Sequence, residues 1–173
     1  MRRHVVLVGL PGSGKSTVSP LLAQRLGAPL HDVDAMLVRR MQMPVHRIFA
    51  EHGETRFRQL EREAMEAVFA ADAGVIAPGG GWAAQPGAVE AAKPRAFVVY
   101  LRTLVTTAAR RAAEGELRPL LAGEDMFERM RQLLAEREPF YRMAHAEIKN
   151  DPPKTAAQAA DEVAALARQH AGW

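Results

Sequence analysis

The sequence predicts an α/β fold in which a five-stranded parallel sheet carries helices on both faces. Short apolar runs alternate along the chain with longer segments whose apolar residues recur at helical spacing, and this alternation is typical of parallel sheets. The first run, residues 4–10, is almost continuously apolar, as expected of a central strand that is buried on both faces. A length of 173 residues suits a single domain, and no repeat or linker divides it.

The predicted elements alternate between strand and helix. The apolar runs that predict strands are residues 4–10, 29–34, 75–77, 96–101 and 146–149. The segments with helical spacing include residues 16–26, 35–41, 56–70, 127–137 and 155–170. We expect the fourth of these helices to end just before Pro139, since proline disfavours helical geometry in the residue that precedes it.

The composition excludes several classes of protein. No apolar run approaches the roughly 18 residues of a membrane-spanning helix, and the absence of cysteine rules out disulfides and thiolate chemistry. The apolar stretch that follows Arg3 breaks at Pro11 without a cleavage site of small residues, so we expect no export signal. We therefore expect a cytoplasmic protein without a membrane partner.

The charges point to small anionic ligands. Lysine and arginine number 23 against 20 acidic residues, a net charge of +3, and they are scattered along the chain, so we expect no nucleic-acid partner. Nineteen of the cations are arginines, whose planar donors suit carboxylates and phosphates. An arginine-rich coding bias would explain this composition equally well.

The segment from Gly9 to Ser16 fits the phosphate-binding pattern G-x-x-x-x-G-K-[ST]. It follows a predicted strand and begins a predicted helix, which is the structural context that this pattern requires. Its amides would surround a phosphate, while Lys15 would reach the β and γ oxygens and Ser16 would bind Mg²⁺. The predicted ATP-binding residues of this segment are Gly12, Ser13, Gly14, Lys15, Ser16 and Thr17.

Two aspartates, Asp32 and Asp34, lie at the end of the second predicted strand. Ligands of parallel α/β sheets lie beyond the carboxyl ends of the strands, so we expect both carboxylates beside the phosphates. One would support Mg²⁺ or take a hydroxyl proton, and the other would accept hydrogen bonds from a polyol. The alternative for either residue is a helix N-cap.

Other polar segments admit both a functional and a structural interpretation. Arg58 and Glu61 form an i,i+3 pair that is either part of an acceptor site or an ordinary surface salt bridge. The glycines that follow the third predicted strand allow a ligand to approach the backbone closely, although a plain flexible loop is the alternative; they are Gly79, Gly80 and Gly81. Arg118 lies in a glycine-flanked segment that suits a mobile lid.

Together these residues resemble the shikimate kinase family. The resemblance extends from His4 to about Asp151. Its motifs are the phosphate-binding segment, D-x-D at residues 32–34, G-E-x-x-F-R-x-x-E at 53–61, the three glycines at 79–81, R-P-L-L at 118–121 and R-x-P-x-Y at 137–141. It implies a P-loop kinase fold with a substrate-binding helical segment at about 33–62 and a mobile lid at about 112–125. The implied protein is a monomer.

The resemblance also implies an activity, the Mg²⁺-assisted transfer of the γ-phosphoryl group of ATP to the 3-hydroxyl of shikimate. The implied catalytic residues are Lys15, Asp32 and Arg118, and the implied Mg²⁺ ligands are Ser16 and Asp32. Arg118 would close with the lid onto the phosphates of ATP, and Arg110 would lie along the adenine, with residues 150–154 on its other side. Shikimate would be bound by Asp34, Arg58, Gly79, Gly80, Gly81 and Arg137. The alternatives are a related kinase for gluconate or a nucleoside monophosphate, and a nucleotide-binding module without catalysis.

Overall fold

A computed structural model of the chain describes residues 1–114 and 125–173. Its centre is a five-stranded sheet in which all paired strands are parallel, in the order β2-β3-β1-β4-β5. The strands are β1 (His4–Val8), β2 (Leu30–Asp32), β3 (Val75–Ala77), β4 (Ala96–Arg102) and β5 (Ala146–Lys149). The predicted fold class is confirmed, and β1 is the central strand, as expected, because it pairs with both β3 and β4.

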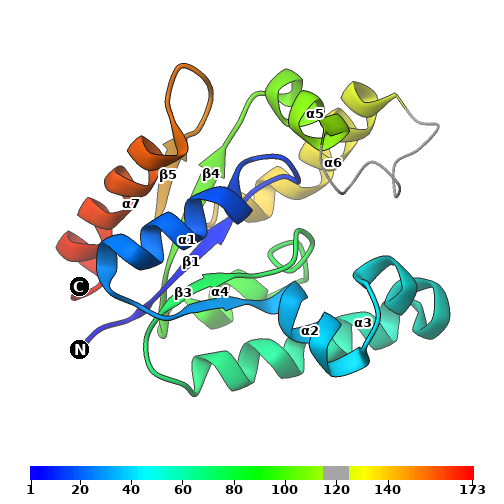
Figure 1. Cartoon of the computed structure of the whole chain (residues 1–173), viewed down its shortest axis with the longest axis horizontal. Helices are drawn as coiled ribbons and strands as arrows, with labels where there is room; N and C mark the ends of the chain where they lie inside the picture. Colours follow the sequence, from blue (N-terminus) through cyan, green and yellow to red (C-terminus); the bar gives the residue numbers. More distant parts are fainter. Residues whose placement is uncertain (115–124) are drawn as a thin grey trace.

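Helices cover both faces of this sheet (Figure 1). They are α1 (Lys15–Leu26), α2 (Val33–Met41), α3 (Val45–Phe69), α4 (Ala88–Ala92), α5 (Val105–Glu114), α6 (Met126–Tyr141) and α7 (Ala156–His170). The side chains of β1 alternate between the two faces. Val5 and Leu7 belong to the core cluster with α1 and α7, whereas Val6 and Val8 belong to the cluster formed with the other helices. Two apolar cores therefore hold the central strand in register.

Helix α6 continues through Pro139 to Tyr141, so the expected end before the proline is wrong. A proline inside a helix removes one hydrogen bond and adds a steric clash. Tertiary contacts of the last turn oppose that cost. The Tyr141 side chain is fully buried, and its ring lies 5.2 Å from that of Tyr100 between centroids.

The second predicted strand is shorter than expected, because Val33 already begins α2 and Asp34 lies in the first helical turn.

Helix α3 starts at Val45, earlier than its apolar spacing indicated, and its helical geometry is interrupted at Gly53, where φ is +79° and ψ is 165°. Glycine adopts this backbone conformation without a steric penalty. The second half of α3, after this break, carries Arg58 and Glu61, and most of the buried residues of the helix lie in it.

Within the described residues, we find no helix with the length and apolar character needed to cross a membrane. The segment of residues 115–124, which contains Arg118 and most of the predicted lid, lies outside the described part of the chain.

Candidate active site

The phosphate-binding segment lies between β1 and α1, at the carboxyl edge of the sheet. Two of its glycines have left-handed φ values, +78° at Gly12 and +97° at Gly14. Side chains there would also collide with neighbours, since a Cβ on Gly12 would lie 2.5 Å from the carbonyl oxygen of Ala108. The segment therefore requires glycine for both conformation and space, which agrees with a loop whose amides surround a ligand.

Two residues from distant parts of the chain support this segment. The buried Asn150 side chain, directly after β5, donates from Nδ2 to the carbonyl oxygen of Ser13 at 2.8 Å. Arg111 of α5 donates to the carbonyl oxygens of Gly12 at 3.3 Å and Asn150 at 3.1 Å. No role was predicted for Arg111, whereas the shikimate kinase resemblance implies that residues 150–154 lie beside the adenine.

Lys15 is partly buried and turned back onto its own loop. Its Nζ donates to the carbonyl oxygens of Gly9 and Leu10, the latter at 2.7 Å. Burial and then the positive charge of Arg137 lower the pKa of Lys15 to about 7, although Asp34 opposes the shift. An anion bound at the loop would favour the protonated amine and oppose the effect of burial.

Asp32 caps helix α2. Its Oδ1 accepts a hydrogen bond from the backbone N–H of Ala35 at 3.0 Å, so the alternative interpretation as an N-cap is confirmed. Cap geometry uses only one carboxylate oxygen. The side chain is exposed at the carboxyl end of β2, and its Oδ2 stays available to a ligand.

Asp34, two residues further on, is turned toward the protein interior. Burial raises the pKa of its carboxyl group, and the nearby Asp32 raises it further, while Lys15 and Arg58 act in the opposite direction. The start of helix α2 therefore has one exposed carboxylate at its N-cap, Asp32, and one enclosed carboxylate in its first turn, Asp34. The enclosed one lies within electrostatic reach of both an ammonium group and a guanidinium group.

Arg58 and Glu61 form a buried ion pair, so their interpretation as a surface salt bridge is wrong. Arg58 Nη1 lies 2.9 Å from Glu61 Oε1, and the two side chains are 14% and 1% exposed. The Arg58 guanidinium carbon also lies 5.4 Å from the ring centroid of Phe57. Burial raises the pKa of Glu61, which Arg58 opposes. The shikimate kinase resemblance names Arg58 but not Glu61 as a substrate-binding residue.

The triple-glycine segment, residues 79–81, lies against the charged cluster that Asp34, Arg58 and Glu61 form. A Cβ on Gly79 would lie 2.5 Å from Glu61 Oε2 and 2.9 Å from Asp34 Oδ1, and one on Gly81 would lie 3.0 Å from the Arg58 guanidinium carbon. Charged side chains thus occupy the space where side chains at positions 79 and 81 would stand. This close approach accounts for Gly79 and Gly81 and disagrees with a plain flexible loop.

Helix α6 reaches the same segment from the opposite side. Arg137 Nη1 donates to the carbonyl oxygen of Gly80 at 3.1 Å, and the hydroxyl of Tyr141 donates to the same oxygen at 3.3 Å. The structure therefore brings together Lys15, Asp34, Arg58, the three glycines and Arg137, as the sequence predicted. It adds Glu61 and Tyr141.

Three buried polar atoms of this cluster have no hydrogen-bond partner within the described part of the chain. They are Asp34 Oδ1, Glu61 Oε2 and Arg58 Nε. Unpaired polar atoms are costly when buried, and in native structures they call for an explanation such as a missing ligand. Two acceptors and one donor together fit a ligand that bears hydroxyl groups and an anionic group.

The remaining predicted site residues are less enclosed. Ser16 and Thr17 are exposed in the first turn of α1, and Arg110 is exposed on α5. The contacts of Arg110 with adenine stay a prediction. Arg118 lies outside the described residues.

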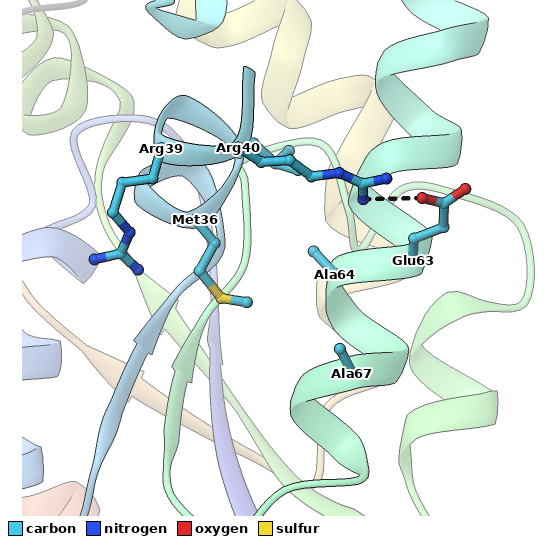
Figure 2. A pocket seen from close by; sticks show the side chains of 7 residues that line it. Met36, Arg39, Arg40, Glu63, Ala64 and Ala67 are labelled. Carbon is cyan, nitrogen blue, oxygen red and sulfur yellow. Dashed lines mark hydrogen bonds and ion pairs between the residues drawn. The ribbon is translucent and has the colours of Figure 1, made fainter. Parts of the chain in front are cut away.

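A separate hollow of about 310 Å³ lies between α2 and α3, outside the charged cluster (Figure 2). Arg40 points across its mouth to Glu63, with Nη1 2.9 Å from Oε2. Leu37 and Ala64 line it, and each stands one helical turn beyond a site residue, Asp34 and Glu61 respectively. The hollow lies where α2 and α3 pack against each other, and none of its lining residues belongs to the charged cluster.

A phosphate-binding loop beside a buried cluster of carboxylates and guanidinium groups, at the carboxyl edge of a parallel sheet, defines a P-loop kinase for a small polar acceptor. The model of the shikimate kinase family matches residues 11–168. The chain belongs to the shikimate kinase family, and it is a kinase that transfers phosphate to an alcohol group of shikimate.

Individual relatives agree with this assignment. Shikimate kinase of Mycobacterium avium is 45% identical over 144 residues, which are 83% of this chain and 81% of the relative. The structure of shikimate kinase from Acinetobacter baumannii in complex with shikimate has a TM-score of 0.88 and 34% identity, covering 98% of this chain and 94% of that one. A gluconokinase from Sinorhizobium meliloti has a TM-score of 0.65 at 18% identity over 99% of this chain and 94% of that one, which shows a shared fold only.

Proposed function

We propose that the protein transfers the γ-phosphoryl group of ATP to the 3-hydroxyl of shikimate, in the cluster between the phosphate-binding loop and the triple-glycine segment. The observation that carries this proposal is a set of three buried atoms that form no hydrogen bond with any described residue, Asp34 Oδ1, Glu61 Oε2 and Arg58 Nε. Shikimate has one carboxylate and three hydroxyl groups, so it supplies an acceptor to a guanidinium group and donors to two carboxylates.

ATP binds with its phosphates in the loop between β1 and α1. The amides from Gly12 to Thr17 surround the β and γ phosphates, and the N-terminus of α1 adds positive potential. Lys15 leaves the carbonyl oxygens of Gly9 and Leu10, which it contacts now, and turns to the phosphate oxygens. A stronger, charge-assisted interaction replaces these bonds.

The acceptor binds with its hydroxyl groups toward the enclosed carboxylates and its carboxylate toward the arginines. Asp34 and Glu61 accept hydrogen bonds from hydroxyl groups. Arg58 and Arg137 bind the carboxylate from two sides, since one reaches Gly81 and the other Gly80. Bidentate guanidinium contacts fix orientation as well as charge, so the reacting hydroxyl is held facing the phosphate loop.

Chemistry at this site rests on positioning and charge. Phosphoryl transfer needs an aligned hydroxyl and neutralisation of the charge on the transferred group. Lys15 neutralises charge, and Asp34, which lies within electrostatic reach of Lys15, orients the hydroxyl and accepts its proton. Arg118 and Arg110 keep their predicted roles at the phosphates and the adenine.

The exposed oxygens at this edge of the sheet fit Mg²⁺. A magnesium ion bound with a nucleotide takes most of its ligands from phosphate and water, and one or two from the protein. The exposed hydroxyl of Ser16 and the free Oδ2 of Asp32 are oxygen donors of the kind it prefers. When bound, the ion neutralises phosphate charge. Asp32 is therefore better suited to the metal than to the reacting hydroxyl.

An acceptor screen tests the function. Purified protein with Mg²⁺ and ATP is incubated with shikimate, gluconate or a nucleoside monophosphate, and ADP formation is followed in a coupled assay. We expect turnover with shikimate alone, and phosphorus NMR of the product is expected to show a phosphate ester coupled to the proton on carbon 3. Turnover with gluconate but not shikimate would overturn the proposal. A cytoplasmic location and a monomeric state stay predictions.

A further inference from the structure

We propose that Tyr141 is a positioning residue that fixes the orientation of the peptide group between Gly80 and Gly81, and thereby aims the Gly81 N–H at the acceptor. The inference rests on the proposed acceptor site. Its basis is the hydrogen bond from the buried Tyr141 hydroxyl to the Gly80 carbonyl oxygen, 3.3 Å long, beside the 3.1 Å bond from Arg137 to the same oxygen.

The triple-glycine segment forms a tight turn. The backbone N–H of Trp82 donates to the carbonyl oxygen of Gly79 at 3.1 Å, which makes Gly80 and Gly81 the two central residues. Neither of them has a positive φ. A type II turn requires a positive φ at its third residue, so this turn is of type I.

Glycine at both central positions leaves the choice of turn type open. Type I and type II turns differ mainly by a flip of the central peptide group, and glycine adopts the φ values of both at little cost. The bond between Trp82 and Gly79 closes either type. Local sequence therefore does not hold the central peptide in one orientation, and contacts from elsewhere in the fold must do so.

Holding the Gly80 carbonyl also orients the Gly81 N–H. The two groups belong to one planar trans peptide and point in opposite directions. With the carbonyl directed at Tyr141 and Arg137, the N–H points away from α6. No residue within the described ranges accepts a hydrogen bond from this N–H, and Gly81 lies against the Arg58 guanidinium. The donor is therefore free to join Arg58 on an anionic group of the acceptor.

Tyr141 has a different role from Arg137. Arg137 is proposed to bind the carboxylate of the acceptor, and this contact competes with the hydrogen bond from Arg137 to Gly80. The Tyr141 hydroxyl also lies within hydrogen-bond reach of the Arg137 side chain, but no ligand group is proposed to compete for it, and its ring is held in the core beside Tyr100. Tyr141 thus keeps the peptide oriented while Arg137 turns to the ligand.

Tyr100 offers a matched control. Its ring is equally buried and lies 5.2 Å from that of Tyr141, but its hydroxyl donates to Glu138 Oε2 at 3.0 Å. Tyr141→Phe and Tyr100→Phe each remove one buried hydroxyl with its contacts, which for Tyr141 include the Arg137 side chain. Of the two, only Tyr141 contacts the triple-glycine segment.

The experiment compares steady-state kinetics of the two variants with those of the wild type. We expect Tyr141→Phe to raise KM and Kd for shikimate about fivefold, the equivalent of one hydrogen bond, with kcat and KM for ATP within about twofold. Tyr100→Phe is expected to leave KM for shikimate within about twofold. Equal increases in both variants, or a fall in kcat with unchanged KM, would overturn the inference.

NMR tests the same inference without catalysis. In the wild type, a type I turn gives a strong amide-to-amide NOE between Gly80 and Gly81, whereas a type II turn gives a strong NOE from the Gly80 α protons to the Gly81 amide. We expect the first pattern in the wild type and in Tyr100→Phe, and a mixture in Tyr141→Phe if that variant folds. A mixture already in the wild type would overturn the inference. Failure of the wild type to bind shikimate would instead refute the proposed function.

Discussion

The carboxylate of Glu61 is divided between two environments, because Oε1 binds Arg58 Nη1 at 2.9 Å while Oε2 has no hydrogen-bond partner in the described ranges. An ion pair that is 14% exposed on one side and 1% on the other is nearly removed from water. Such a pair is costly to break, because the partner left behind is a buried, unpaired charge. Glu61 therefore both holds Arg58 in place and presents a free acceptor to the ligand.

Glu61→Ala is expected to lower the free energy of unfolding by about 3 kcal/mol, as found for buried ion pairs that lose one partner. It is also expected to raise KM for shikimate more than tenfold, since it releases Arg58 and removes an acceptor. Urea denaturation and steady-state kinetics measure the two effects. The control is Glu54→Ala, because Glu54 lies 3.8 Å from Arg58 Nε but is 72% exposed. Similar losses in both variants would show that burial of the pair is unimportant.

Gly79→Ala is expected to weaken shikimate binding more than tenfold, because the new Cβ would stand 2.5 Å from Glu61 Oε2 and would displace both carboxylates. Isothermal titration calorimetry with shikimate measures the change. Gly80→Ala is the control. A Cβ there meets its first neighbour at 3.6 Å, an ordinary contact, so we expect a much smaller effect. The prediction fails if both alanine variants bind shikimate as the wild type does.

The pH dependence of stability is expected to reflect Lys15. Its folded-state pKa of about 7 lies below its ordinary value of 10.5. Between these values the unfolded chain binds more protons than the folded protein, so this residue makes stability increase with pH. The free energy of unfolding of Lys15→Met should exceed that of the wild type most at or below pH 7. This difference should disappear toward pH 10.

Urea denaturation from pH 6 to pH 10 measures this difference. Lys149→Met, at an exposed position, is the control and should show no such trend. The Lys15 variant is also expected to lose at least about a hundredfold in kcat/KM, as happens when a charge-stabilising group is removed. An advantage of Lys15→Met that does not vary with pH would contradict the assigned pKa.

Asn150→Ala is expected to raise KM for ATP about fivefold by loosening the phosphate-binding loop, because it removes the 2.8 Å bond to the Ser13 carbonyl oxygen. KM for shikimate should change less than twofold. Lys149→Ala, at the exposed neighbouring position, controls for local disturbance of β5. An equal rise of both KM values in Asn150→Ala would mean that this bond supports the whole fold and not the loop.

Features that depend on contiguous residues were predictable from the sequence. The phosphate-binding loop lies within eight successive residues, and its glycines, lysine and serine have their roles because of local spacing. The apolar runs predicted all five strands, most clearly β1 and β4, because the residues of a buried parallel strand are apolar on both faces. The N-cap at Asp32 was among the predicted alternatives for the same reason, since a cap joins residues only three positions apart.

Features that depend on distant residues were decided by the tertiary structure. The order of the strands, the burial of the Arg58–Glu61 pair and the continuation of α6 through Pro139 all depend on which elements pack together. The bond from Asn150 to Ser13 spans 137 positions, and the bond from Tyr141 to Gly80 spans 61. An i,i+3 ion pair looks the same in sequence on a surface and in a core. Its energy depends on how much water surrounds it, and only the packing of α3 against the sheet core and the triple-glycine segment removes that water.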